Sequence, residues 1–166
     1  YHKDGQDWRF YEIDPLVVKI AQDPQWFQYL ERCNKSAAMI VGDARLSLTQ
    51  EADASFDLLI MDAFSSDAVP THLLTREAMQ LYFSKLKEDG LLAFHITNRH
   101  LALKKVLADH VESMHLSGLL QEFRPENAAP LVVATDWVVV AKHPERLERL
   151  RQSRLGHWQK LPITFG

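Results

Sequence analysis

Short apolar runs alternate along this chain with longer segments in which apolar residues recur at helical spacing. The runs have the length of buried strands. They fall at residues 8–13, 37–41, 56–61 and 91–96. The intervening segments predict helices that begin at Pro15 and after Thr75, and a third helix over Leu101–Met114. Strands that alternate with helices predict an α/β domain built on a parallel sheet.

Two later apolar runs, Leu119–Phe123 and Trp137–Ala141, flank a turn-forming segment at Asn127–Pro130. A reversal of the chain there predicts an antiparallel pair of strands. A final helix is expected from Pro144 through about Gln152. A mostly parallel sheet with an antiparallel edge pair resembles the sheet of Rossmann-like methyltransferases.

The helix ends and apolar faces are also predicted. Asp14 is expected to cap the first helix, with Pro15 at its first position. Gly90 is expected to close the helix that Thr75 caps. The first helix presents an apolar face formed by Leu16, Val17, Ile20 and Ala21. Residues 25–32 are expected to resume a helix whose apolar side chains pack inward: Trp26, Phe27, Tyr29 and Leu30.

Composition narrows the class of protein. A chain of 166 residues with 46% hydrophobic and 25% charged residues fits one globular domain, residues 1–166. A net charge of −3 argues against a nucleic-acid partner. The single cysteine, Cys33, allows no internal disulfide and indicates a reducing compartment. We therefore expect a cytoplasmic domain, either free or attached to a membrane protein, and the start at Tyr1 reads as part of something longer.

Acidic residues stand at the ends of three predicted strands, where ligands bind in open α/β sheets. Asp62 follows residues 56–61 and is placed to take a proton from an amine nucleophile. Glu12 can accept both hydroxyls of a ribose, or it is a surface acid near a helix N-terminus. Asp43 follows Gly42, which allows a ligand to approach the backbone closely. Asp43 either accepts a hydrogen bond from an adenine amino group or caps a short helix.

Histidine and serine residues occur in and near the same segments. His72, His95 and His100 have no spacing typical of a metal site, so no metal is expected. His95 lies on a predicted buried strand, where a hydrogen-bonded core histidine is the simpler interpretation. The segment Thr97–Arg99 at the end of that strand can line the same pocket as Asp62. Ser65 and Ser66 are interpreted as loop residues rather than nucleophiles.

Four segments in order along the chain resemble the spermidine synthase family of aminopropyltransferases, in its spermidine synthase-like branch. They are residues 10–15 (FYEIDP), 41–45 (VGDAR), 57–64 (DLLIMDAF) and 73–77 (LLTRE). The resemblance spans roughly residues 8–107. It implies an enzyme that moves an aminopropyl group from decarboxylated S-adenosylmethionine to a diamine such as putrescine, with release of methylthioadenosine.

The resemblance also implies roles for individual residues. Asp62 is the catalytic residue that deprotonates or orients the amine, and Asp67 and His95 contact the same substrate. Around the nucleoside, Glu12 holds the ribose hydroxyls and Asp43 the adenine amino group. Three neighbours complete that cofactor-binding set: Ile13, Gly42 and Ala44.

The chain departs from the family pattern in ways that keep two alternatives open. Asp67 lies five residues after Asp62, rather than in an Asp-x-x-Asp-Pro motif, and His95 replaces a common glutamine. S-adenosylmethionine is therefore an alternative co-substrate, for a small-molecule methyltransferase. A non-catalytic nucleoside-binding domain is the second alternative.

The family also has a Gly-rich loop and a first strand before the segment that begins at Trp8, together with a small N-terminal β domain. We expect a partial Rossmann-like sheet that lacks that strand and loop, joined in the full protein to a β domain or membrane segment. From this expectation the chain alone should bind nucleoside poorly, and unpaired strand edges should favour a homodimer.

Overall fold

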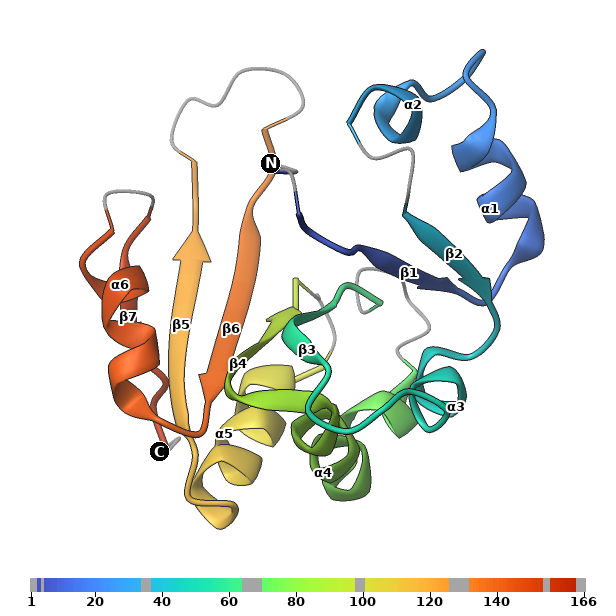
Figure 1. The fold of residues 1–166 in the computed structure, drawn as a ribbon. Coiled ribbons are helices and arrows are strands. Elements are labelled where there is room, and N and C mark those ends of the chain that lie inside the picture. The colour runs from blue at the N-terminus through green and yellow to red at the C-terminus, as the bar shows by residue number, and fades with distance from the viewer. Residues whose placement is uncertain are drawn as a thin grey trace. The chain divides into compact units, whose positions relative to one another are not determined.

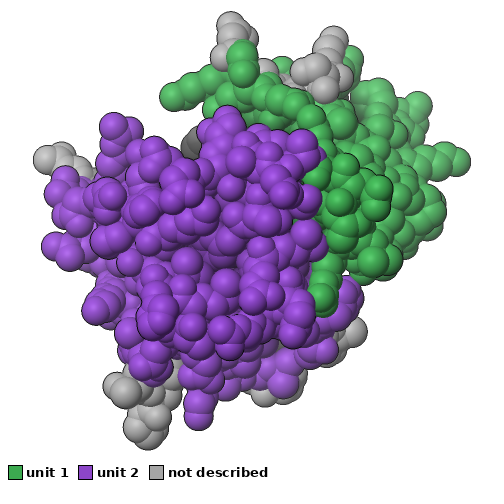
Figure 2. All heavy atoms as spheres, turned by 60° about the horizontal axis from the view of Figure 1, so that its bottom comes forward, with its two compact units in different colours: residues 1–51 green, residues 52–166 purple. Residues whose placement is uncertain are grey.

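The structure is a computed structural model, and it describes residue 3 and residues 5–33, 37–63, 70–97, 101–125, 132–153 and 156–163. The chain divides into two compact units, unit 1 (Tyr1–Glu51) and unit 2 (Ala52–Gly166), coloured separately in Figure 2. Each unit has its own sheet. The single domain expected over residues 1–166 stays a prediction.

Unit 1 contains a two-stranded parallel sheet of β1 (Arg9–Glu12) and β2 (Ala38–Val41). Its helices are α1 (Pro15–Gln22), α2 (Tyr29–Cys33) and α3 (Ala44–Leu48). Parallel strands need a long crossover, and α1 and α2 lie on the one that joins β1 to β2 (Figure 1). The predicted start of α1 is confirmed, because the side chain of Asp14 accepts a hydrogen bond from the N–H of Leu16.

The apolar side chains of unit 1 are more exposed than the sequence pattern predicts. The prediction that Trp26, Phe27 and Tyr29 pack inward is wrong, since all three are exposed. Residues 25–27 also form no helix, and α2 begins only at Tyr29. On α1 the buried residue is Val18, whereas Leu16 is exposed. A unit with two short strands and three short helices offers little surface to cover so many large side chains.

Unit 2 contains a five-stranded sheet in the order β3–β4–β6–β5–β7. The strands are β3 (Phe56–Met61), β4 (Leu86–His95), β5 (Ser117–Phe123), β6 (Thr135–Ala141) and β7 (Trp158–Lys160). β3 and β4 run parallel, and every other neighbouring pair is antiparallel. The predicted antiparallel pair is confirmed as β5 and β6, and β6 lies between β4 and β5 (Figure 1).

The helices of unit 2 pack against this sheet. They are the 3-10 helix η1 (Thr71–Leu74), α4 (Arg76–Lys85), α5 (Leu103–Ser113), the 3-10 helix η2 (Pro144–Leu147) and α6 (Glu148–Arg151). α4 packs on β4, and α5 packs on β5 and β6 (Figure 1). The ring of Tyr82 in α4 lies 6.5 Å from the ring of Phe94 in β4, which places Phe94 on the helix-covered face.

Successive residues of a strand point to opposite faces, so Ala93 and His95 lie on the face opposite Phe94. On that face Ala93 belongs to a buried cluster with residues of β5, β6 and η2: Leu119, Val139, Ala141 and Leu147. The cluster covers the middle of the sheet and leaves part of β3 open, since Leu58 and Ile60 are exposed. His95 and its neighbours therefore lie beside a packed core rather than inside it.

Three elements of unit 2 differ from the prediction. Gly90 does not close α4, which ends at Lys85, because β4 begins at once with Leu86 paired to Phe56. The amine of Lys85, nearly buried, lies 2.6 Å from the carboxylate of Asp53. The predicted final helix is split into η2 and α6, and β7 is too short for its pattern to reveal a strand.

The strand that ends at Glu12 and the strand that precedes Asp62 belong to different sheets. Among the described residues, no ladder of hydrogen bonds joins β1 to β3. The two groups of predicted site residues therefore lie at the strand ends of two separate sheets.

Candidate active site

The register of β3 and β4 brings Asp62 and His95 together. Met61 pairs with Phe94 on the helix-covered face, so the next residue of each strand points to the opposite face. Oδ1 of Asp62 lies 2.6 Å from Nδ1 of His95. The Asp62 side chain is 58% exposed and the His95 side chain is 16% exposed, so a well-held imidazole supports an accessible carboxylate.

The second ring nitrogen of His95 also has a partner. Nε2 lies 2.7 Å from Oγ1 of Thr97, and the same hydroxyl oxygen accepts a hydrogen bond of 2.8 Å from the main-chain N–H of Asp136. The hydrogen bonds expected of His95 are present, but His95 is only partly buried and lies beside the core rather than in it. The contact with Asp62 makes His95 a residue of the site.

Residues of β6 and the end of β5 support this arrangement. The indole of Trp137 stacks on the imidazole of His95, with ring centroids 4.7 Å apart and planes 21° apart. The nearly buried carboxylate of Asp136 receives two hydrogen bonds from Arg124, at 2.6 and 3.0 Å. Hydrogen bonding to Asp136 raises the pKa of Arg124 above its ordinary value, while partial burial opposes the increase. A bidentate pair of this kind fixes the backbone whose N–H anchors Thr97.

Arg124, Asp136 and Trp137 were not predicted as parts of the site. Thr97 was expected only to line the pocket. Its spacing from His95 indicates that the two side chains lie close together, because residues two apart on an extended strand point to the same side. The remaining residues come from other strands, and the sequence carries no comparable sign of their proximity.

In unit 1 the ends of β1 and β2 bring Glu12 close to Gly42 and Asp43. Glu12 pairs with Val41 in the ladder, and the N–H of Gly42 donates to the main-chain carbonyl of Glu12 at 2.9 Å. The half-buried carboxylate of Glu12 accepts a hydrogen bond of 2.9 Å from the N–H of Asp14. Glu12 is therefore oriented at the carboxyl end of β1, with one carboxylate oxygen held by the N–H of Asp14.

Asp43 and Gly42 have structural roles that the sequence allowed for. Oδ1 of Asp43 accepts a hydrogen bond of 3.0 Å from the N–H of Leu46, so Asp43 caps α3. The adenine contact expected of Asp43 stays a prediction. Gly42 has a φ of +147°, and a Cβ there would lie 3.3 Å from Oγ of Ser47. Glycine is needed at this turn for its backbone conformation.

The other predicted site residues divide into described and undescribed ones. Ile13 follows β1 and is 69% exposed, and Ala44 is the first residue of α3. Asp67 lies outside the described residues, as do Ser65, Ser66, Asn98, Arg99 and His100.

No group of three or more potential metal ligands occurs within the described ranges, and His72 is exposed on η1. Over the same ranges, no helix combines the length and apolarity that crossing a membrane requires.

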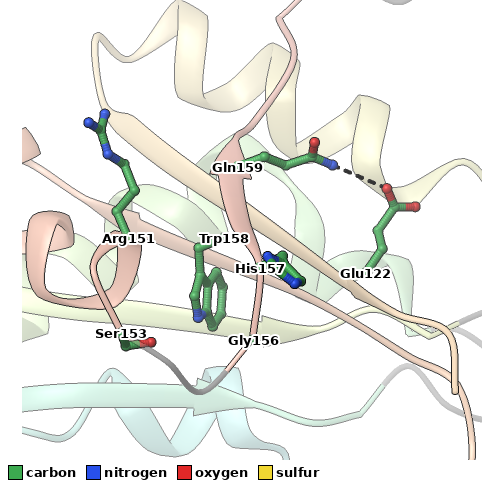
Figure 3. A pocket seen from close by; sticks show the side chains of 7 residues that line it. All are labelled: Glu122, Arg151, Ser153, Gly156, His157, Trp158 and Gln159. Atoms are coloured by element: carbon green, nitrogen blue, oxygen red, sulfur yellow. Dashed lines mark hydrogen bonds between the residues drawn. The ribbon is translucent and has the colours of Figure 1, made fainter.

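Two hollows mark the described surface of unit 2, and neither is lined by Asp62 or His95. One, of about 390 Å³, lies between α6, β5 and β7 (Figure 3). Its side chains point in different directions, and Gln159 donates to Glu122 at 3.3 Å, so no group of charges converges there. The other, of about 310 Å³, is mostly apolar and lies at the start of α5, beside Ile96 and Asp136. The site at Asp62 is described by its hydrogen bonds at the strand ends.

The fold is of the Rossmann-like α/β kind found in solved spermidine synthases and in a methyltransferase-like protein. A crystal structure titled as spermidine synthase in complex with the transition state analogue AdoDATO aligns with a TM-score of 0.66 at 18% identity. The alignment covers 98% of this chain and 56% of that one. At this identity the likeness concerns the fold alone.

Similarity in sequence extends to two kinds of transferase. The polyamine aminopropyltransferase of Vibrio vulnificus (strain CMCP6) is 31% identical over 83 residues, which are 49% of this chain and 26% of that protein. The N-terminal histidine N-methyltransferase of Emericella nidulans is 32% identical over 95 residues, which are 55% of this chain and 16% of that protein. No protein-family model matches the sequence. The chain thus spans about a quarter or less of the length of either relative.

Proposed function

We propose that this chain is the catalytic part of a spermidine synthase-like aminopropyltransferase. The donor is decarboxylated S-adenosylmethionine, and the acceptor is a small diamine such as putrescine. Methylthioadenosine is the second product. The proposal is supported by similarity to the Vibrio enzyme over about half of the chain and by the residues at the strand ends.

The observation that carries the proposal is the position of Asp62. Its carboxylate follows a parallel strand, is 58% exposed, and has Oδ1 engaged by Nδ1 of His95. No described residue donates a hydrogen bond to Oδ2. An accessible carboxylate with one oxygen held, and no described donor on the other, is suited to bind an ammonium group and to accept its proton.

The transfer is a displacement at carbon. The acceptor nitrogen forms a bond to the aminopropyl carbon, and the bond from that carbon to the sulfonium sulfur breaks, with its electron pair leaving on sulfur. Before it attacks, the nitrogen must lose a proton, and Oδ2 of Asp62 accepts it. Alignment of nitrogen, carbon and sulfur supplies most of the acceleration, so the role of Asp62 combines orientation with proton acceptance.

The nucleoside part of the donor is assigned to the strand ends of unit 1. Glu12 offers carboxylate oxygens to the ribose hydroxyls, beside a turn that Gly42 keeps free of a side chain. Asp43 is assigned to the adenine amino group through the carboxylate that also caps α3. Ile13, exposed next to Glu12, provides an apolar surface for the adenosine.

An assay with two donors tests the proposal on the full-length protein that contains this chain. Incubation with decarboxylated S-adenosylmethionine and putrescine should yield methylthioadenosine and an aminopropylated amine, both detected by mass spectrometry. Incubation with S-adenosylmethionine and the same amine should yield nothing. Turnover with the second donor alone would contradict aminopropyl transfer.

A methyltransferase is the second candidate. It is favoured by the similarity to the Emericella methyltransferase and by the presence of His95 where the spermidine synthase family commonly has glutamine. Formation of S-adenosylhomocysteine in the same assay would identify it. Nucleoside binding without turnover of either donor would instead indicate the non-catalytic alternative.

A further inference from the structure

The hydrogen bonds around His95 form a series, and its two ends determine which group donates and which accepts. A main-chain N–H can only donate, so the amide of Asp136 donates to Oγ1 of Thr97, at 2.8 Å. An ionised carboxylate can only accept, so beside ionised Asp62 the Nδ1 of His95 carries a proton and donates to Oδ1, at 2.6 Å. Both ends of the series are therefore determined without reference to a ligand.

Between these ends, one arrangement gives every proton an acceptor. With Nδ1 protonated and Nε2 bare, the hydroxyl of Thr97 donates to Nε2 across 2.7 Å and accepts from Asp136. If Nε2 were also protonated, the hydroxyl oxygen would accept twice, and its own proton would have no acceptor among the described residues. The other partner of a histidine decides which ring nitrogen carries the proton.

We propose that Thr97 is a positioning residue, which keeps His95 in the Nδ1–H form and thereby fixes the carboxylate of Asp62 for the transfer reaction. The role of Thr97 in the reaction rests on the proposed function. Its role in positioning His95 rests on the geometry alone. Trp137 contributes by stacking on the imidazole, which restricts rotation of the ring. With Oδ1 held by His95, Oδ2 is the oxygen that faces the acceptor nitrogen.

The chemical consequence concerns the acceptor. A histidine in the Nδ1–H form presents no lone pair to Asp62 and takes no proton from it, so the proton of the acceptor stays on Oδ2 until solvent removes it. Among the described residues of the site, the carboxylate of Asp62 is then the group placed to accept a proton, and a carboxylate suits a cationic amine better than a neutral hydroxyl or thiol. This chemistry agrees with the amine acceptor of the proposed function.

The first experiment measures the ring directly. In the full-length protein labelled with ¹⁵N-histidine, long-range ¹H–¹⁵N spectra distinguish a protonated from a bare ring nitrogen, and loss of one signal set in His95→Gln assigns it to His95. We expect a protonated Nδ1 and a bare Nε2 in the native protein and in Thr97→Ser. Thr97→Val removes the hydroxyl that donates to Nε2, so a form protonated on both ring nitrogens should appear beside the Nδ1–H form. An unchanged ring in Thr97→Val would overturn the proposal.

The second experiment measures turnover. Thr97→Val should lower kcat roughly tenfold, by analogy with other residues that orient a catalytic group, and leave the KM for the nucleoside donor unchanged. Thr97→Ser should retain native turnover. Equal losses in the two variants would contradict a role of the hydroxyl. Circular dichroism melting identifies any variant whose loss comes from unfolding.

A double-mutant cycle tests whether Thr97 acts through His95. The side-chain amide of asparagine can replace Nδ1–H as the donor to Asp62 but does not reach Thr97. In the His95→Asn background, Thr97→Val should cause no further loss of kcat. A full additional loss would contradict the proposed route. The ring spectra can follow the expectation while neither the native protein nor any variant turns over a nucleoside donor. In that case the proposed function fails, and the positioning of His95 by Thr97 stands.

Discussion

Nδ1 of His95 lies 2.6 Å from Oδ1 of Asp62, across 33 residues of sequence. The contact follows from the parallel pairing of Met61 with Phe94, which places the next residue of each strand on the same face. Asp62 remains exposed while His95 is nearly buried, so the imidazole is held in place and the carboxylate is accessible. This asymmetry is what makes Asp62 the residue to test first.

Replacement of Asp62 by Asn should abolish most of the transfer activity. The amide keeps the size of the side chain but cannot accept the proton, so kcat should fall roughly 100- to 10,000-fold. Nucleoside binding, measured by calorimetry with methylthioadenosine on the full-length protein, should persist. Asp57→Asn is the matched control, because Asp57 lies on the same strand and, among the described residues, its exposed carboxylate pairs with Lys87. Equal turnover in the two variants would exclude Asp62 as the base.

Replacement of Arg124 by Met should destabilise the protein. The carboxylate of Asp136 is nearly buried and would lose two hydrogen bonds, while the exposed guanidinium itself gains little from the pair. We expect the free energy of unfolding to fall by about 1–3 kcal/mol, measured by urea denaturation. The control is Arg149→Met, at an exposed position of α6, where a change within about 0.5 kcal/mol is expected. A similar loss in the control would show that charge alone, and not the pair with Asp136, is responsible.

Replacement of Gly42 by Ala should destabilise unit 1 and weaken nucleoside binding. The φ of +147° is unfavourable for any residue with a Cβ, and the expected cost is about 1–3 kcal/mol. The nearest obstacle to the new Cβ is Oγ of Ser47, at 3.3 Å. The double variant Gly42→Ala/Ser47→Ala removes that contact but leaves the backbone strain. Recovery of native stability in the double variant would show that crowding, and not φ, requires glycine.

Tyr11 should make stability sensitive to alkaline pH. Burial and the hydrogen bond of 2.7 Å that its hydroxyl donates to Glu51 raise the pKa of Tyr11 above its ordinary value. The folded protein therefore holds this proton more tightly than the unfolded chain. The resulting stability is present in full below the unfolded pKa of about 10 and is lost as pH rises beyond it.

Tyr11→Phe tests this dependence. The variant should be about 1 kcal/mol less stable than the native protein near neutral pH, and its stability should decline less as pH rises above about 10. Urea denaturation at several pH values measures both effects. Tyr29→Phe, at an exposed position of α2, should leave the alkaline decline as it is in the native protein. An identical decline in native protein and Tyr11→Phe would contradict the assignment.

Much of the fold could be read from local sequence. The predicted limits of β3 are the observed ones, and Asp14 and Thr75 cap the helices that they were predicted to cap. These features depend on residues a few positions apart, so a single chain segment contains the necessary information. Where a local signal competed with a longer-range one, as at Gly90, the pairing of β4 with β3 decided the boundary.

The sequence by itself determined the α/β class, the antiparallel pair of β5 and β6, and the placement of Glu12, Asp43 and Asp62 at strand ends. Only the tertiary structure decided that Asp62 is hydrogen-bonded to His95, and that Thr97 is hydrogen-bonded to both His95 and the amide of Asp136. The physical reason is that strand register fixes which distant side chains meet, and register depends on the packing of whole elements. The same reason accounts for the exposed aromatic residues of unit 1, because burial depends on how much surface the neighbouring elements provide.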